Sequence, residues 1–128
     1  MSERGKIRVE LWRHSGVLLI VTGLLHTAVG VALGWERLLA IAGDGLFGAA
    51  ASDIGRQFAF WFVAMGIVIV ILGHLMHHYI VKEQRPPPRF IGYYFLGMSA
   101  VGCAIEPVSG MWLFIPQALI IIFADRGG

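Results

Sequence analysis

Long apolar stretches separated by short polar segments dominate the pattern along the chain. Residues 14–35 contain no Asp, Glu, Lys or Arg, and neither do residues 57–81. As helices these stretches are roughly 33 to 38 Å long at 1.5 Å per residue, which is enough to cross the hydrocarbon core of a bilayer. The pattern therefore predicts membrane-spanning helices over about 12–33 and 57–81.

The apolar region 90–124 is interrupted by Glu106-Pro107-Val108-Ser109-Gly110. Pro and Gly in this order end one helix and turn the chain. Each half is only roughly 24 Å long as a helix, which is shorter than a typical span. We predict two short spans over about 90–106 and 109–124, and a re-entrant hairpin is the alternative.

Residues 35–55 are too polar to cross a membrane and too apolar for a free loop. We expect a short helix lying along the membrane surface, with Ser52 or Asp53 capping the next helix near Arg56. The predicted fold class is all-α: a transmembrane four-helix bundle in one domain, 1–128, with a short interfacial helix between spans 1 and 2.

Composition agrees with a membrane protein and excludes several classes. Hydrophobic residues make up 57% of the 128 residues and charged residues 14%, which is too little charge to cover the surface of a soluble domain. The net charge of +2 is small and forms no basic stripe, so nucleic acid is not an expected partner. Cys103 is the only cysteine, which excludes an intrachain disulfide, and we expect it to be a packing residue.

The basic residues are distributed unevenly between the two sides of the predicted bundle. Arg37 and Arg56 flank the connection between spans 1 and 2. The others lie at the chain ends or between spans 2 and 3: Arg4, Lys6, Arg8, Arg13, Lys82, Arg85, Arg89 and Arg126. By the positive-inside rule the larger group is cytoplasmic. We predict a multi-pass protein of the cell membrane with both termini in the cytoplasm.

Small residues recur at helix-contact spacing. Gly30 and Gly34 form a G-x-x-x-G, Gly23 and Thr27 share its spacing, and Gly66 and Gly73 mark span 2. In lipid, helices associate where small residues let their backbones approach. We expect these positions at helix contacts, and a homo-oligomer is an open alternative to contacts within one chain.

Two ionisable residues are candidates for chemistry inside the membrane. His26 lies near the middle of span 1 and shares a face with Thr22 and Gly30. Such residues are functional candidates by default, although a neutral histidine that ties two helices together is the plainer interpretation. Glu106, at the outer end of span 3, is the second candidate, because burial there would raise its pKa and suit it to proton transfer.

Further residues are candidates for ligand contacts. Asp44 and Arg56 are placed to line the outer mouth of the bundle, and Trp61 and Trp112 are candidates for lining an apolar pocket. Gln117, in the last span after Pro116, is the first candidate for a partner of His26.

Four histidines are predicted near the cytoplasmic side. His74, His77 and His78 have the i, i+3, i+4 spacing of metal ligands, and His14 is expected at similar depth. No cysteine accompanies them, and Glu83 is the only evident carboxylate, so we expect neither a metal site nor a cofactor.

Several motifs together resemble a known family: Gly23-Leu24-Leu25-His26-Thr27, Asp44-Gly45-Leu46-Phe47, Phe58-Ala59-Phe60-Trp61-Phe62, and Pro107-Val108-Ser109-Gly110-Met111-Trp112-Leu113 followed by Pro116-Gln117-Ala118-Leu119. The chain resembles, over about 12–123, a family of small bacterial four-helix integral membrane proteins catalogued as a domain of unknown function. The resemblance implies that His26, Trp61, Ser109 and Gln117 belong to the family pattern. Glu106 departs from this pattern, in which an apolar residue is expected before Pro107. No reaction is known for the family, so the resemblance implies none.

Two functions are compatible with these residues. The first is a helical bundle that binds a hydrophobic ligand or a partner within the lipid bilayer. The second is a membrane-embedded isomerase, hydratase or cyclase that moves protons on a lipid or isoprenoid-like substrate through His26 and Glu106. Loss of turnover in His26→Ala with unchanged folding would favour the enzyme.

Overall fold

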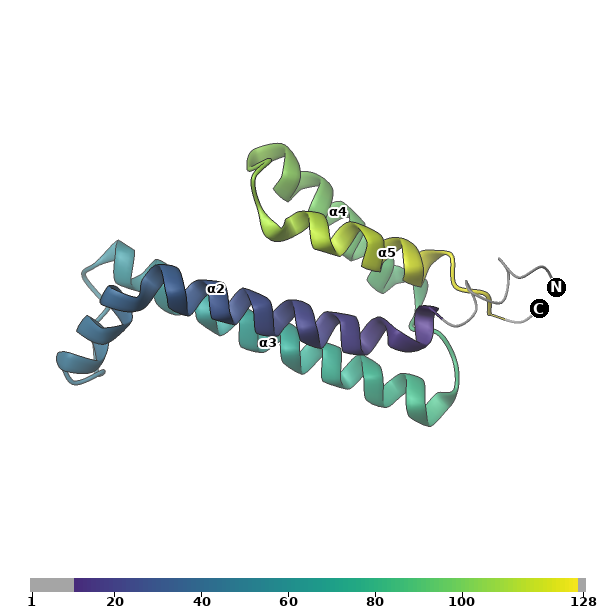
Figure 1. Cartoon of the computed structure of the whole chain (residues 1–128), viewed down its shortest axis with the longest axis horizontal. Coiled ribbons are helices and arrows are strands. Elements are labelled where there is room, and N and C mark those ends of the chain that lie inside the picture. The colour runs from purple at the N-terminus through teal and green to yellow at the C-terminus, as the bar shows by residue number, and fades with distance from the viewer. Residues whose placement is uncertain (1–10, 127–128) are drawn as a thin grey trace.

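The computed structural model describes residues 11–126, and every regular element within them is a helix, without strands. The elements in order are η1 (Trp12–His14), α2 (Ser15–Gly43), α3 (Ile54–Glu83), α4 (Arg89–Ile105), η2 (Gly110–Leu113) and α5 (Phe114–Ile122). They form two hairpins, a long one of α2 and α3 and a short one of α4 and α5 (Figure 1). Helix α3 and the continuous helical stretch Trp12–Gly43 are both long and apolar enough to cross a membrane.

The first helix is longer than the sequence predicts. Helix α2 continues to Gly43, so Leu38 to Ile41 belong to its last turns. The prediction of a separate interfacial helix within 35–55 is therefore wrong. The physical reason is that no proline or turn signal interrupts the chain between Trp35 and Ala42. The first such signal is Gly43-Asp44-Gly45, where Gly45 adopts a φ of 87°.

The start of α3 agrees with the prediction from sequence. Asp53 is its N-cap, and the Asp53 Oδ1 accepts hydrogen bonds from the backbone N–H groups of Gly55 (2.9 Å) and Arg56 (3.1 Å). These bonds satisfy two of the donors that the first turn of a helix leaves free.

The break between the last two helices is also confirmed. Helix α4 ends at Ile105, and Ser109 caps the 3₁₀ turn η2 by accepting a hydrogen bond from the Met111 N–H at 3.4 Å. Helix α3 ends at Glu83, and its C-cap Gln84 adopts the left-handed conformation at φ 53°. The connection from there to α4 contains three consecutive prolines, 86–88.

Glycines line the contact between α2 and α3. A Cβ built on Gly16 would lie 2.5 Å from the backbone nitrogen of His77, and one on Gly23 would lie 2.7 Å from that of Val70. From the other side, a Cβ on Gly73 would lie 2.6 Å from the backbone nitrogen of Ile20. Larger residues cannot occupy these positions at this separation, so the glycines set how closely the two backbones approach.

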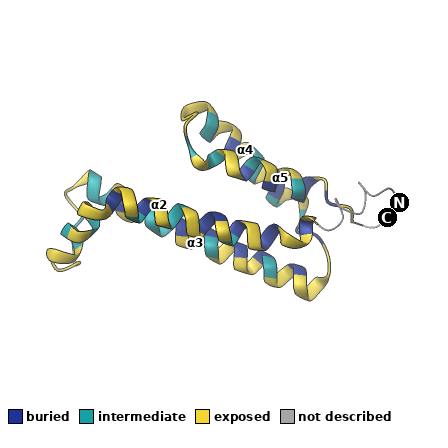
Figure 2. Cartoon of the chain, in the orientation of Figure 1, coloured by how far each residue is buried: buried dark blue, intermediate teal, exposed yellow. Residues whose placement is uncertain are grey.

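Most of the small residues of α2 at the contact with α3 are buried, whereas most of its large apolar residues are exposed. The buried positions of α2 include Ser15, Gly16, Thr22, Gly23, Gly30 and Gly34, whereas Leu24, Leu33 and Trp35 are 57%, 80% and 55% exposed. In Figure 2 both long helices carry exposed residues along most of their outer surface. The interior is therefore rich in small residues and the exterior in large apolar ones.

The two hairpins meet over a limited area. Helix α5 contacts α2, and the shared core contains Leu19, Met76, Phe114 and Ile121. The turn of the short hairpin diverges from α2 (Figure 1). At the opposite end Arg126 donates to the Pro87 carbonyl at 2.5 Å, which ties the end of α5 to the connection before α4.

Replacing Gly73 by alanine should destabilise the long hairpin. The new Cβ meets backbone atoms, Ile20 N at 2.6 Å and Gly16 O at 2.9 Å, which cannot rotate away. Overpacking of this kind costs about 1–3 kcal/mol, which outweighs the gain of up to about 1 kcal/mol in helix propensity. Thermal unfolding in detergent, followed by circular dichroism, measures the difference.

Gly97→Ala is the matched control. A Cβ at Gly97 meets nothing within 4 Å, so this variant should be as stable as the parent or more stable. Equal destabilisation by both substitutions would contradict the close contact of α2 with α3.

Candidate functional site

A polar contact joins the two hairpins. The Gln117 Nε2 group on α5 donates to the Thr22 hydroxyl on α2 at 2.7 Å and to the Leu113 carbonyl at 3.0 Å. Both side chains are buried, at 6% and 8% exposure. The Leu113 carbonyl fixes the orientation of the amide, because a reversed amide would set two oxygen acceptors against each other.

This contact leaves one acceptor without a partner. The Gln117 Oε1 atom is buried and receives no hydrogen bond within residues 11–126. The Thr22 hydroxyl donates to the Leu18 carbonyl at 2.8 Å and so is not available to it. An N–H or O–H group from a ligand or a water molecule would satisfy this oxygen.

His26 lies one helical turn from Thr22 and is half-buried. Its ring stacks on Phe62 of α3, with centroids 4.0 Å apart and planes 9° from parallel. The Nε2 atom is buried and has no hydrogen-bond partner among the described residues. His26 thus contributes to the contact between α2 and α3 by ring stacking.

The predicted partnership of His26 with Gln117 is wrong, because Gln117 turns its amide to Thr22 instead. Glu106 is exposed at the C-cap of α4, at the turn that diverges from α2. The His26 Nε2 atom receives no hydrogen bond from Glu106 or from any other residue in 11–126. Their catalytic roles stay a prediction.

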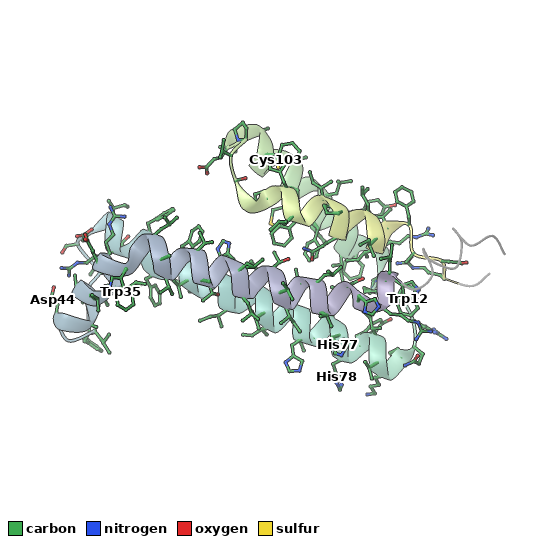
Figure 3. All side chains as sticks on the ribbon, viewed as in Figure 1. Trp12, Trp35, Asp44, His77, His78 and Cys103 are labelled. Atoms are coloured by element: carbon green, nitrogen blue, oxygen red, sulfur yellow. The ribbon has the colours of Figure 1, made fainter. Side chains whose placement is uncertain are left out.

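Asp44 and Arg56 pair with each other across the turn between α2 and α3. The Arg56 Nη1 atom lies 2.6 Å from the Asp44 Oδ2 atom and also donates to the Ala49 carbonyl at 2.8 Å. The Asp44 side chain is 58% exposed. Figure 3 shows Asp44 and Trp35 at the end of the molecule opposite Trp12. The pair closes this turn, and an exposed ion pair of this kind contributes at most about 1 kcal/mol.

The two candidate tryptophans lie on the outer surface. Trp61 of α3 is 66% exposed and packs edge-on against Phe60, with ring centroids 5.3 Å apart. Trp112 of η2 is 55% exposed, and its indole N–H donates to the Pro107 carbonyl at 2.7 Å. Such amphipathic rings suit a membrane interface better than an enclosed pocket.

The histidines of α3 point in different directions. His77 lies against Gly16 of α2, and its Nδ1 atom is buried without a partner, whereas His74 and His78 are exposed. Figure 3 shows His77 and His78 toward the end of the molecule where Trp12 lies. Residues 11–126 contain no cluster of three or more side chains of the types that bind metals.

A groove that the sequence does not predict opens between α3 and α4. It has a volume of about 310 Å³ and is lined by Leu19, Leu72, Leu75, Met76, Tyr79, Pro87, Pro88, Ile91 and Phe95. It forms because α5, rather than α4, packs on the long hairpin. Its length along α4, from Pro88 to Phe95, is about 10 Å. The recurrence of apolar residues at 88, 91 and 95 is the only signal of it in the sequence.

A family model described as a family of unknown function (DUF6463) matches residues 10–128. The protein is a member of the DUF6463 family. This confirms the resemblance to a family of unknown function inferred from the sequence. No curated protein and no solved structure shows significant similarity to this DUF6463 chain.

A double-mutant cycle tests the contact between the hairpins of this DUF6463 protein. Thr22→Val and Gln117→Met nearly preserve shape and remove the hydrogen bond between them. We expect a coupling energy of about 0.6 kcal/mol, with an upper limit of about 1.7 kcal/mol, which are the values found for hydrogen bonds between helices in membrane proteins. Unfolding by a denaturing detergent measures it. Strictly additive effects of the two substitutions would contradict the contact.

Proposed function

We propose that this DUF6463 member is a multi-pass integral membrane protein in which both hairpins cross the bilayer. We further propose that the groove between α3 and α4 binds the aliphatic chain of a lipid-like ligand. The ends of the chain and the 84–88 connection lie on the cytoplasmic side in this scheme, as the distribution of basic residues favours.

The exposed surface of the long helices supports insertion. In the most apolar segment of Trp12–Gly43 only 28% of the residues are buried, and in that of Ile54–Glu83 only 22%. A core helix of a soluble protein, by contrast, is mostly buried. Large exposed side chains such as Leu33 (80%) and Leu75 (62%) favour lipid as the surrounding solvent.

The length of the short hairpin is compatible with a crossing. Helix α4 has 17 residues and is therefore about 26 Å long. Local thinning of the bilayer accommodates such a mismatch at a modest cost. Glu106, the only charged residue between Arg89 and Asp125, lies in the turn, where it would reach the opposite surface.

The groove is the observation that carries the ligand-binding proposal. Its volume of about 310 Å³ is at the lower end of the range for ligand pockets. Apart from the Tyr79 hydroxyl, the side chains that line it are apolar, so it suits a hydrocarbon chain rather than a polar substrate.

Membrane insertion predicts how the protein fractionates. After alkaline carbonate washing of membranes, the protein should stay in the pellet, because its apolar surface has no stable place in water. Immunoblotting of pellet and supernatant measures this. A monomer that stays soluble without detergent would contradict insertion.

A lipid with a photoreactive group in its acyl chain tests the groove. We expect cross-links to concentrate on groove residues such as Leu72, Met76 and Ile91 when the reconstituted protein is digested and mapped by mass spectrometry. Ile91→Trp, which fills the groove, should lower this labelling several-fold.

Met98→Trp is the matched control, since Met98 is 48% exposed and does not line the groove. It should leave the labelling of the groove unchanged. Cross-links spread evenly over all exposed apolar residues, with no effect of Ile91→Trp, would refute the proposed binding site.

A further inference from the structure

Two arginines come together where α4 begins and α5 ends. Arg89 is the first residue of α4, and Arg126 follows α5. Both line a surface hollow of about 430 Å³, together with Tyr93, Ile122, Phe123, Ala124 and Asp125. Both arginine side chains are exposed and accessible to a ligand.

The hydrogen bonds of Arg126 hold its guanidinium in place without neutralising its charge. It donates to the carbonyls of Pro87 at 2.5 Å, Ala124 at 2.9 Å and Ile121 at 3.2 Å. All three acceptors are uncharged backbone groups. Arg89 makes no hydrogen bond or ion pair with any residue in 11–126.

Counting residues 11–126 only, the side chains that line the hollow carry a surplus of positive charge. Burial of the Arg126 guanidinium and the nearby charge of Arg89 lower the pKa of Arg126, whereas Tyr79 and Tyr93 raise it. Asp125 contributes one carboxylate to the hollow against two guanidinium groups. An anion placed between the arginines would relieve their mutual repulsion.

Arg126 lies at the end of the apolar groove. Pro87, whose carbonyl accepts from Arg126, lines that groove, and so does Tyr79, which raises the pKa of Arg126. The first turn of α4 has no side-chain cap, so its free N–H groups add partial positive charge at the same end. A molecule with its chain in the groove would thus have its polar end beside Arg126, which lines the hollow together with Arg89.

We propose that Arg89 and Arg126 bind the phosphate of an anionic phospholipid whose acyl chain occupies the groove between α3 and α4. This inference rests on the proposed function. The Arg89 guanidinium suits phosphate because it can donate two parallel hydrogen bonds, whereas Arg126, whose Nη2 group already donates to Pro87 and Ile121, contributes mainly its charge. The anionic lipids of the cytoplasmic leaflet are attracted to basic residues at that surface.

Native mass spectrometry of the full chain tests the site with phosphatidylglycerol and phosphatidylcholine of identical acyl chains. The parent protein should retain phosphatidylglycerol preferentially. Arg89→Gln should lower this preference about fivefold, the effect of one basic residue near a membrane surface. Since Arg89 makes no hydrogen bond in residues 11–126, its loss should not disturb folding. Arg126→Lys, which keeps the charge but not the planar fork, should weaken the preference less than Arg89→Gln.

Arg85→Gln is the matched control, because Arg85 is exposed in the same connection but lines neither the hollow nor the groove. It should leave the preference unchanged. An equal loss in Arg85→Gln would mean general surface attraction and would overturn the site. Binding of glycerol phosphate with the same dependence on Arg89 would identify a site for free anions and would also overturn the lipid assignment.

The failure of this inference differs from that of the proposed function. If photoreactive chains still label the groove but both lipids are retained equally, the headgroup site is refuted and the ligand groove stands. If the chains do not label the groove at all, the proposed function itself fails.

Discussion

The backbones of α2 and α3 approach closely because glycine stands at the positions where they meet. Gly16, Gly23 and Gly73 face backbone atoms of the opposite helix at separations that leave no room for a Cβ. Since small residues fill the contact, most of the large apolar side chains of the pair face outward. An apolar solvent suits that outward surface better than water, so the glycine contact is consistent with the membrane location proposed above.

The short hairpin depends on the long one for its position. Helix α5 reaches α2 through the amide of Gln117 and the hydroxyl of Thr22, and through the core around Leu19 and Phe114. Helix α4 makes few contacts with α3, and the groove is the space that remains between them. The same arrangement places the end of the groove next to Arg126, which connects an apolar chain site to a basic surface.

Features set by local sequence were predictable, and those set by the meeting of the hairpins were not. The Asp53 cap and the break at Pro107 depend on neighbouring residues, and both agree with prediction. The sequence predicts the end of α2 too early, because the polar residues after Trp35 resemble a boundary although no proline or turn signal lies between Trp35 and Ala42. The pairing of Gln117 with Thr22 and the groove require knowing that α5, rather than α4, packs on α2, which helical periodicity does not reveal.

Accessibility of single cysteines to a membrane-impermeant thiol reagent tests the membrane arrangement most directly. In a Cys103→Ala background, cysteine is placed at Phe47, Val68 or Arg85, of which Phe47 and Val68 are 101% and 45% exposed in the structure. The account predicts labelling of Phe47→Cys in intact cells, labelling of Arg85→Cys only after permeabilisation, and no labelling of Val68→Cys in either state. Labelling of Val68→Cys, or of the other two from the same side, would contradict it.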